Sequence, residues 1–342
     1  MQKTDQRIAG ICRDMGAANC VGPTLERLAA VGCEVQVFMD SAGKGTSTLK
    51  EKNISYQLVD DESDLMEKLG EFQPHAVVVG LSAPRGPVES AADHFAMESR
   101  TPLVHIEDYY GSFSRAHITP DLVVTIDTAA HDLVRQEYPH ARIVCAGLAG
   151  IAPIHPRQSL VDRFDQIRKD HDCKIVVYTD GDTHAESGLR LFLQSLDLTR
   201  TPWVLLPHFH PKYVGQKTGS GTYGELWESM LTPYRKRGLV IDASEPADEV
   251  VQCADLVASG YSTLLFRALS AKKTPLTLWN DETKQTLMYK MKLAETPLMM
   301  GGKTPVITGP VSLDDILASA APDVDLQPFD AHRAAEAVLG LL

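Results

Sequence analysis

A polar turn in the second half of the chain has the residue types that bind anions. The sequence Gly260-Tyr261-Ser262-Thr263 lies between an apolar run, Leu256–Ser259, and a helical pattern. A turn that opens a helix exposes N–H groups without helical partners, at the positive end of the helix dipole. Phosphate groups bind at such positions. We therefore expect a phosphate-bearing ligand here, with a nucleotide among the candidates, unless Ser262 or Thr263 only caps the helix.

A second group of polar residues follows the first expected strand, Arg7–Cys12. We expect the segment Arg13–Asn19 to be a turn before a helix that begins at Pro23. The carboxylate of Asp14 would take a proton from an acceptor hydroxyl. The alternative is a tight turn and helix cap without chemistry. The residues of this turn that would bind an acidic group of the acceptor are Arg13, Gly16, Ala17 and Asn19.

Acidic residues also follow the expected strand Pro102–Ile106. The carboxyl ends of parallel strands meet at one edge of a sheet, where ligands bind. A hydroxyl that attacks as a nucleophile must lose its proton, so a carboxylate at this edge is a candidate general base. Asp108 is therefore the second candidate base beside Asp14, and the sequence does not show which one acts. His105, within the strand, is expected to be buried.

Two histidines flank Phe209 after the expected strand Trp203–Leu206. Residues at i and i+2 of an extended chain project to the same side, so His208 and His210 would face one ligand together. A zinc site is incomplete because no nearby Cys or His supplies further ligands, and we predict no metal. We expect both histidines to hydrogen-bond to a diphosphate, with Lys212 adding positive charge, unless their role is structural.

Short apolar runs alternate with amphipathic stretches over nearly the whole chain, which is typical of βαβ units around a parallel sheet. The expected strands of the first half are Arg7–Cys12, Glu34–Met39, Tyr56–Val59, Ala76–Gly80, Pro102–Ile106, Leu122–Ile126 and Arg142–Cys145. Those of the second half are Lys174–Tyr178, Trp203–Leu206, Leu239–Asp242, Leu256–Ser259 and Pro275–Leu278. The Gly- and Ser-rich segment Gly215–Gly224 is expected to be a mobile loop.

This alternation predicts an α/β fold with two doubly wound, Rossmann-like domains that face a central cleft. The stretch Gly147–Pro156, with its glycines and prolines, is the expected linker. We place one domain at residues 1–150, the second at residues 151–328, and a C-terminal helix at residues 329–342.

The composition is typical of a soluble globular protein, with 44% hydrophobic and 23% charged residues among 342. The net charge of −12 argues against generic nucleic-acid binding, which needs a basic surface. No run approaches the roughly 18 apolar residues of a membrane span, and the N-terminus lacks a signal-peptide core. The six cysteines form no C-x-x-C pair, as expected for thiols in a reducing cytoplasm. We therefore expect a cytoplasmic protein.

Several segments resemble, in chain order, the GT-B-fold glycosyltransferases and their relatives, the UDP-N-acetylglucosamine 2-epimerases and the polyol-phosphate transferases. In those proteins an Ala-Asp-Leu-Val strand is followed by Gly-x-Ser-Thr, a helix and a Gly-Lys-Pro step. The matching segments of this chain are Ala254–Val257, Gly260–Thr263 and Lys272–Pro275. The segment Leu206–Lys212 resembles the His-Pro element of the same domain. In the first half, Arg13–Asn19 and Pro120–Gly147 resemble the first Gly-rich turn and the segment that closes the domain.

The resemblance implies a metal-independent GT-B glycosyltransferase without a cofactor. Residues 151–328 would bind a nucleotide-sugar co-substrate, expected to be UDP-linked, and residues 1–150 an unidentified acceptor. The loop Thr179–His184 would pack near the donor phosphates, with Asp182 or Thr183 capping the helix Ala185–Leu196. The alternatives are a nucleotide-sugar 2-epimerase and a GT-B-like binding protein without catalysis. A homodimer is left open.

One position departs from this pattern. Many retaining transferases of the group, and the epimerases, carry a glutamate four residues after the threonine of the turn, and it accepts a hydrogen bond from the donor ribose. This chain has Arg267 there. A guanidinium has no acceptor atom, but it pairs well with phosphate. Either the donor is held differently, the donor is not the usual one, or activity is lost; the epimerase reading is the one that Arg267 weakens.

Overall fold

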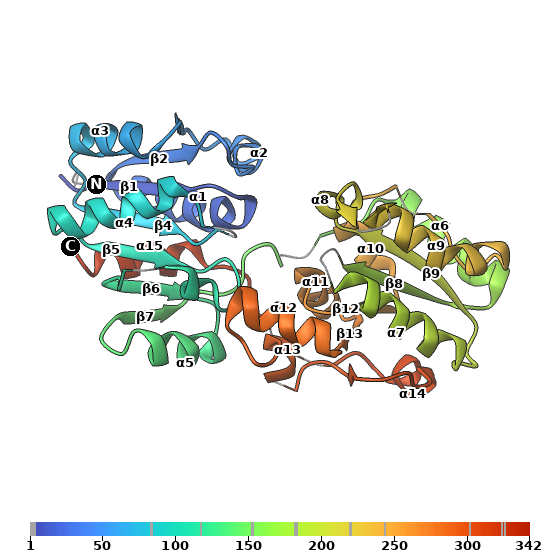
Figure 1. The fold of residues 1–342 in the computed structure, drawn as a ribbon. Coiled ribbons are helices and arrows are strands. Elements are labelled where there is room, and N and C mark those ends of the chain that lie inside the picture. Colours follow the sequence, from blue (N-terminus) through green and yellow to red (C-terminus); the bar gives the residue numbers. More distant parts are fainter. Residues whose placement is uncertain are drawn as a thin grey trace. The chain divides into compact units, whose positions relative to one another are not determined.

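The chain forms two compact units in the computed structural model (Figure 1). Unit 1 consists of Met1–Ala152 and Gln327–Leu342, and unit 2 of Pro153–Leu326. The last residues of the chain therefore belong with the first ones. The residues that the structure describes are 5–82, 85–116, 118–151, 154–180, 184–218, 221–242, 244–300, 302–322, 324 and 326–342.

Unit 1 is built on a parallel sheet of seven strands in the order β3-β2-β1-β4-β5-β6-β7. Its strands are β1 (Arg7–Cys12), β2 (Glu34–Asp40), β3 (Gln57–Val59), β4 (Ala76–Gly80), β5 (Leu103–Ile106), β6 (Leu122–Thr125) and β7 (Arg142–Cys145). The strand order reverses between β1 and β4. Ligands of such sheets bind outside the carboxyl ends of the strands at this switch point. A ligand of unit 1 is therefore expected at the loops that follow β1 and β4.

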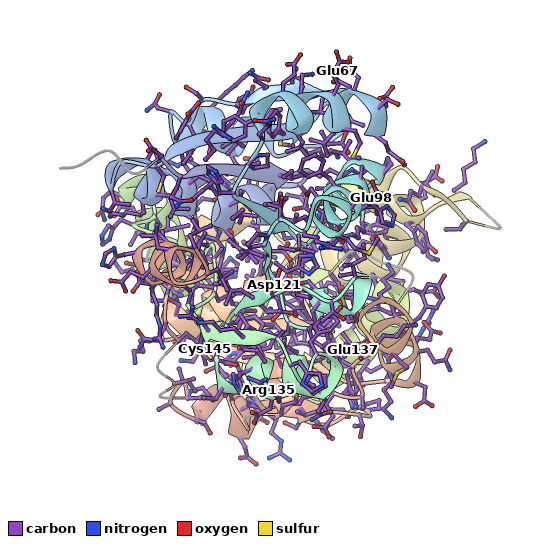
Figure 2. The ribbon with its side chains drawn as sticks, turned by 90° about the vertical axis from the view of Figure 1, so that its left-hand side faces the viewer. Glu67, Glu98, Asp121, Arg135, Glu137 and Cys145 are labelled. Atoms are coloured by element: carbon purple, nitrogen blue, oxygen red, sulfur yellow. The ribbon has the colours of Figure 1, made fainter. Side chains whose placement is uncertain are left out.

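Helices cover both faces of this sheet because successive strand residues point to opposite sides. Ile8 packs with α1 (Met15–Ala30) and α15 (Ala331–Leu339) on one face, whereas Ala9 packs with α3 (Glu62–Phe72) and α4 (Pro87–Ser99) on the other. Charged side chains such as Glu67 and Glu98 lie on the outside of these helices (Figure 2). The helices of unit 1 are α1 (Met15–Ala30), α2 (Thr46–Glu51), α3 (Glu62–Phe72), α4 (Pro87–Ser99), the 3-10 helix η1 (Ser112–Arg115), α5 (Thr128–Glu137) and α15 (Ala331–Leu339).

The C-terminal helix α15 completes the core of unit 1. A bridge between Leu148 and Pro328 brings the chain back to this unit. Val338 of α15 is fully buried in the cluster that also holds Ala18 and Val21 of α1. The helix that carries the first candidate site is thus supported by the last residues of the chain.

Unit 2 has a five-stranded parallel sheet in the order β14-β13-β12-β8-β9 and a small antiparallel hairpin, β10-β11. The strands are β8 (Lys174–Asp180), β9 (Trp203–Phe209), β10 (Lys217–Thr218), β11 (Gly221–Thr222), β12 (Leu256–Ser259), β13 (Thr274–Leu278) and β14 (Val306–Ile307). The helices are α6 (Gln158–His171), α7 (Ala185–Asp197), α8 (Pro211–Val214), α9 (Tyr223–Lys236), α10 (Ala247–Cys253), α11 (Thr263–Ser270), α12 (Asp281–Met291), α13 (Pro297–Met300) and α14 (Asp314–Ala318). Phe192 of α7 and Trp227 of α9 pack with Tyr178 of β8 in the main core.

The structure corrects three local expectations. The first helix begins at Met15 rather than Pro23, because Ala17, Ala18 and Val21 are buried against the sheet and this packing outweighs the break at proline. The expected strand Leu239–Asp242 is reduced to a single bridge between Leu205 and Val240. The expected loop Gly215–Gly224 contains the strands β10 and β11 and the first residues of α9.

Candidate functional site

Asp14 caps the first helix of unit 1. Its backbone is extended and its Oδ1 atom accepts a hydrogen bond from Ala17 N at 2.9 Å, while its carbonyl accepts one from Ala18 N at 3.0 Å. The expected turn is therefore the start of α1, and the Ala17 amide is used by Asp14 instead of being left for a ligand. Ala17 is also fully buried, whereas Asn19 lies half-buried in the second turn.

The two candidate bases reach the same helix end from different strands. A Cβ placed on Gly16 would lie 2.2 Å from Oδ2 of Asp108, so the carboxylate of Asp108 packs directly on this glycine. Gly16 is the second residue of α1 and Asp14 is its cap. Two carboxylates thus meet at the positive end of a helix dipole, which stabilises negative charge. A side chain at position 16 would collide with the carboxylate of Asp108.

Arg13 is held by the loop that follows β2. Its Nε atom lies 3.1 Å from Oδ2 of the buried Asp40, and its carbonyl accepts a hydrogen bond from Gly45 N at 3.0 Å. The Arg13 side chain is 25% exposed, so part of this cation reaches the surface. Contact between Arg13 and an acidic group of the acceptor stays a prediction.

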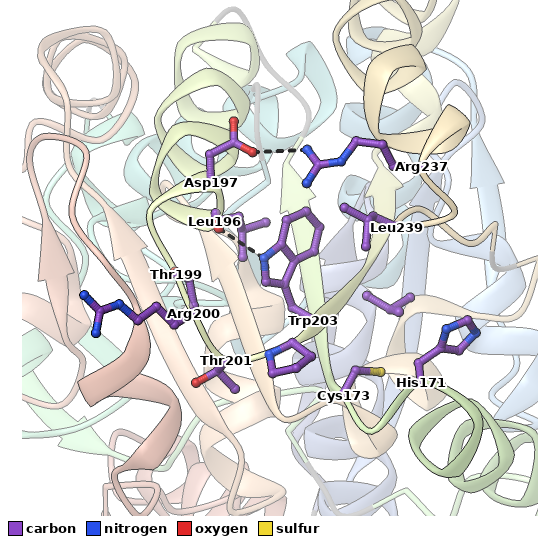
Figure 3. A pocket seen from close by; sticks show the side chains of 12 residues that line it. His171, Cys173, Leu196, Asp197, Thr199, Arg200, Thr201, Trp203, Arg237 and Leu239 are labelled. Atoms are coloured by element: carbon purple, nitrogen blue, oxygen red, sulfur yellow. Dashed lines mark hydrogen bonds and ion pairs between the residues drawn. The ribbon is translucent and has the colours of Figure 1, made fainter.

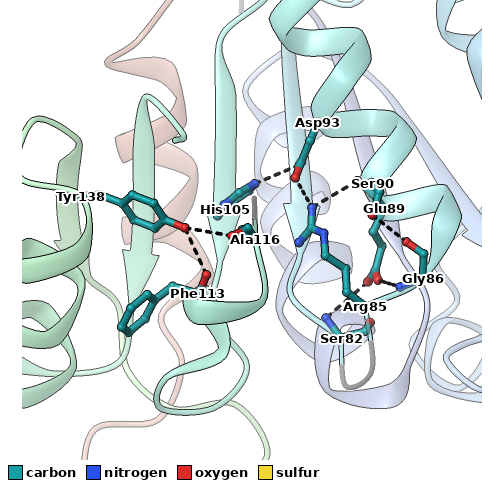
Figure 4. Close-up of polar contacts among 10 residues, drawn as sticks. All are labelled: Ser82, Arg85, Gly86, Glu89, Ser90, Asp93, His105, Phe113, Ala116 and Tyr138. Atoms are coloured by element: carbon teal, nitrogen blue, oxygen red, sulfur yellow. Dashed lines mark hydrogen bonds and ion pairs between the residues drawn. The ribbon is translucent and has the colours of Figure 1, made fainter. Parts of the chain in front are cut away.

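A buried glutamate shapes the loop after β4 (Figure 4). Glu89 is fully buried, and its carboxylate accepts hydrogen bonds from Gly86 N at 2.8 Å and Ser82 N at 3.3 Å. Burial raises the pKa of Glu89, opposed by these two hydrogen bonds and by the nearby Arg85. Ser82 Oγ accepts a hydrogen bond from Asp14 N at 3.3 Å, so this loop supports the candidate base.

His105 is buried, as expected, and its role is structural. Its Nε2 atom lies 3.0 Å from Oδ1 of Asp93, which also pairs with Arg85 (Figure 4). Burial lowers the pKa of His105. Glu107, two residues further along, is a buried acid that the sequence analysis did not select; it accepts hydrogen bonds from Thr125 Oγ1 and from Phe113 N.

In unit 2, the turn Gly260–Thr263 joins β12 to α11 as expected, and Ser262 is the helix cap. Ser262 Oγ accepts a hydrogen bond from Leu264 N at 3.2 Å. The N–H of Ser262 donates to Ser259 Oγ, and that of Gly260 donates to the carboxylate of Asp180. Several amides that the sequence left for a ligand are therefore used within the chain. Thr263, the first residue of α11, is exposed.

The two histidines lie at the carboxyl end of β9. Phe209 stacks on Trp227 in the core, with ring centroids 4.2 Å apart, so His208 and His210 project to the other side of the chain, as expected. His208 is half-buried and His210 is exposed, with its ring edge-on to Tyr213. The backbone of Lys212 lies in α8, but its side chain is outside the described atoms, as are Asp182 and Thr183.

Arg267 has a carboxylate partner in a helix that the sequence analysis did not predict. Its Nε atom lies 3.0 Å from Oδ1 of Asp248, in α10. Burial lowers the pKa of Arg267 and raises the pKa of Asp248. The attraction between the two side chains opposes both shifts, and the electrostatic interaction with His208 also acts to lower the pKa of Asp248. Within the described part of the chain, the buried Nη1 atom of Arg267 has no hydrogen-bond partner.

A pocket at the opposite edge of this sheet does not belong to the site. It has a volume of about 220 Å³ and lies at the amino ends of β8 and β9, beside Cys173 and Trp203 (Figure 3). Trp203 Nε1 donates to the carbonyl of Leu196, and Arg237 pairs with Asp197. Its main polar groups thus have partners within the protein.

Neither a metal cluster nor a membrane-spanning helix is found among the described residues. No three His, Cys, Asp or Glu residues in these ranges gather closely enough to hold a metal ion. None of the helices described has both the length and the apolar composition that a bilayer crossing requires.

Solved structures share the fold over nearly the whole chain. A putative UDP-N-acetylglucosamine 2-epimerase from Listeria monocytogenes has 13% identity and a TM-score of 0.65, over 98% of this chain and 95% of that one. Anabaena HepE in complex with UDP and glucose has 11% identity and a TM-score of 0.63, over 97% and 94%. Acinetobacter baumannii MurG has 13% identity and a TM-score of 0.52, over 98% and 91%.

Sequence comparison adds nothing to this: no family model and no curated protein matches the chain. Identities of 11–13% show a common fold and not a common activity. The two parallel sheets and the full-length likeness confirm the predicted fold class, an α/β protein with two Rossmann-like domains of the GT-B type.

Proposed function

We propose that this protein is an enzyme that acts on a nucleotide sugar, with glycosyl transfer as its reaction. The observation that carries the proposal is the full-length likeness to proteins solved with UDP or named for UDP-sugars. The chemistry of the residues agrees with it. Carboxylates suited to deprotonate a hydroxyl meet at one helix end of unit 1, and cationic groups lie at the carboxyl edge of unit 2.

In this proposal unit 2 holds the donor. Thr263 at the start of α11 and the histidines after β9 would contact the diphosphate, together with Lys212. Tyr261 and Ser262 would shape the turn. Arg267 would use Nη1 toward a donor oxygen, while Asp248 neutralises the guanidinium and supplies the acceptor atoms that arginine lacks.

Unit 1 would bind the acceptor and activate it. Asp108 or Asp14 takes the proton of the acceptor hydroxyl, and the oxygen of that hydroxyl bonds to the anomeric carbon of the sugar. The bond from that carbon to the diphosphate breaks, and the nucleoside diphosphate leaves with the electron pair. Arg13, next to Asp14 in the chain and partly exposed, suits an acceptor with an acidic group.

A panel of nucleotides and nucleotide sugars tests the donor assignment. A ligand present at about 100 times its dissociation constant stabilises the folded state by about 2.7 kcal/mol, so the thermal midpoint rises measurably. We expect UDP and UDP-sugars to raise it. If millimolar nucleoside diphosphates of every base leave it unchanged, the proposal is wrong.

An epimerase is the second candidate, because the Listeria structure is a putative epimerase and its TM-score of 0.65 is higher than the 0.63 of HepE and the 0.52 of MurG. Proton NMR of a bound UDP-sugar incubated without any acceptor separates the two activities. New anomeric signals of a second sugar epimer indicate the isomerase. Turnover only after addition of an acceptor indicates transfer, and binding without either reaction indicates a protein that has lost catalysis.

A further inference from the structure

One residue of unit 2, Asp180, contacts three segments of the chain around the proposed donor site. The side chain of Asp180, at the end of β8, accepts a hydrogen bond from Gly260 N at 2.9 Å through Oδ2. Its Oδ1 atom lies 2.8 Å from Nε2 of His184. Its backbone carbonyl accepts a hydrogen bond from His210 N at 3.0 Å. Asp180 and His184 are only 7% and 1% exposed, so both of these side chains lie inside the protein.

The sheet order explains why this residue reaches so many partners. β8 lies between β12 and β9 in the sheet, so its carboxyl end adjoins the carboxyl ends of both. The β8–β9 ladder continues to the pair of Asp180 and Phe209, whereas the β8–β12 ladder stops at Tyr178 and Ala258. Beyond that point the backbones are no longer paired. The Asp180 side chain makes the connection that the ladder no longer provides.

The other side of the turn is equally confined. The ring of Tyr261 stacks on His184, with centroids 5.0 Å apart and planes at 28°. A Cβ placed on Gly260 would lie 2.9 Å from His184 Nε2 and 3.0 Å from Thr283 Cγ2. The turn is thus held between a carboxylate that binds its amide and an imidazole that packs on it.

We propose that Asp180 is the positioning residue of the donor site: it fixes the Gly260–Thr263 turn relative to His210, so that both meet one diphosphate. A buried carboxylate is costly unless its oxygens are paired, and here both have partners, one of them an imidazole. The inward N–H of the turn is satisfied by Asp180, while Thr263 at its outer end is left exposed to a ligand. The inference rests on the proposed nucleotide-sugar function.

The test compares UDP with uridine, which lacks the diphosphate. Both ligands are titrated into the full-length protein and into Asp180→Ala, below the unfolding temperature of each, by calorimetry for UDP and by ligand-observed NMR for uridine. We expect Asp180→Ala to weaken UDP binding at least tenfold and to change uridine binding less than twofold. General damage to the unit would weaken both ligands alike. An unchanged ratio of the two affinities overturns the inference.

Asp314→Ala is the matched control. Asp314 also accepts backbone N–H groups, from Thr201 at 2.8 Å and from Arg200 at 3.2 Å, but at the amino end of β9. Its loss should leave the ratio of the two affinities as in the wild type; a fall equal to that of Asp180→Ala would show a general effect and contradict the assignment.

Gly260→Ala decides the matter if Asp180→Ala does not fold. The added methyl would press on His184 and move the turn away from an intact Asp180, so the same selective loss of UDP affinity is expected, and its absence overturns the inference. A wild-type protein that binds no UDP contradicts the proposed function itself, and the inference falls with it.

Discussion

Asp14 and Asp108 follow β1 and β5, and both lie at the start of α1, where Asp14 is the helix cap and Asp108 packs on Gly16. Because a Cβ on Gly16 would lie 2.2 Å from the Asp108 carboxylate, Gly16→Ala must move that carboxylate. We expect turnover of the nucleotide sugar to fall about 100-fold, since small displacements of a catalytic group have effects of this size. The UDP dissociation constant should stay within twofold, because the proposed UDP contacts lie in unit 2.

Gly70→Ala is the control for this substitution. Gly70 lies within α3, and a Cβ there meets nothing within 4 Å. Alanine is favoured over glycine inside a helix by about 1 kcal/mol, so this variant should be somewhat more stable and fully active. Turnover by Gly16→Ala equal to that of Gly70→Ala would remove Asp108 from the proposed mechanism.

Asp14 caps α1 and is also a proposed general base, and substitution can separate the two roles. Asparagine caps helices as well as aspartate does, whereas alanine at a cap costs about 1 kcal/mol. Asp14→Asn should therefore keep the free energy of unfolding measured in urea, and Asp14→Ala should lower it by about 1 kcal/mol. If Asp14 is the base, both variants lose turnover by about 100-fold or more. An active Asp14→Asn enzyme would leave Asp108 as the base.

The elements that position these residues were predictable to different degrees. The bounds of β1, β4, β7 and β12 agree with the sequence expectations, because a short run of apolar residues between polar ones leaves little choice of register. The predicted start of α1 at Pro23 was wrong. The helix begins eight residues earlier because Ala17 and Ala18 are buried by tertiary packing, which the local sequence does not show.

Partners that are distant in sequence were the main omission at the site. The contacts of Asp248 with Arg267, and of Asp180 with Gly260, join residues 19 and 80 positions apart. Neither contact has a signal in the local sequence. The helix that carries Asp248, α10, is too short to show a clear pattern, and the sequence pattern assigns Asp180 to a polar loop although it is the last residue of β8. Only the sheet order, which brings β8 beside β12, makes the second contact visible.

The buried Glu89 in the first turn of α4 should make stability depend on pH. Burial raises the pKa of Glu89 above its ordinary 4.5, so the folded state holds this proton more tightly than the unfolded state does. The resulting stabilisation is complete below about pH 4.5 and is lost as the pH rises through the raised pKa. The free energy of unfolding of Glu89→Gln, relative to that of the wild type, should therefore increase between about pH 5 and pH 8. Each tenfold difference in proton affinity between the folded and unfolded states contributes about 1.4 kcal/mol to this change.

Urea unfolding at the two pH values measures this difference. The control is Glu67→Gln on α3, where the glutamate is exposed (Figure 2) and its change should be the same at both pH values. A pH-independent difference between Glu89→Gln and wild type would show that burial does not govern this carboxyl group.

At the scale of the whole molecule, the first and last segments of the chain form one unit. Val338 of α15 is fully buried with residues of α1, so Val338→Asp would place an unpaired charge in that core. We expect the midpoint temperature of the unit 1 transition to fall by many degrees. A second transition, whose midpoint temperature UDP still raises, would report an intact unit 2. Glu336→Ala on the exposed side of α15 should change neither transition.

If Val338→Asp abolishes the response to UDP together with the stability of unit 1, the two units do not fold independently. UDP binding by unit 2 would then depend on α15 and on the core of unit 1.

A crystal structure with UDP tests the central claim most directly. The account predicts the diphosphate at the carboxyl edge of the unit 2 sheet, in contact with Thr263 and with His208 or His210, and with Arg267 Nη1 on a ligand oxygen. It also predicts that the Asp180–Gly260 hydrogen bond persists in the complex. UDP bound at the amino edge beside Trp203, or within unit 1, would contradict the account.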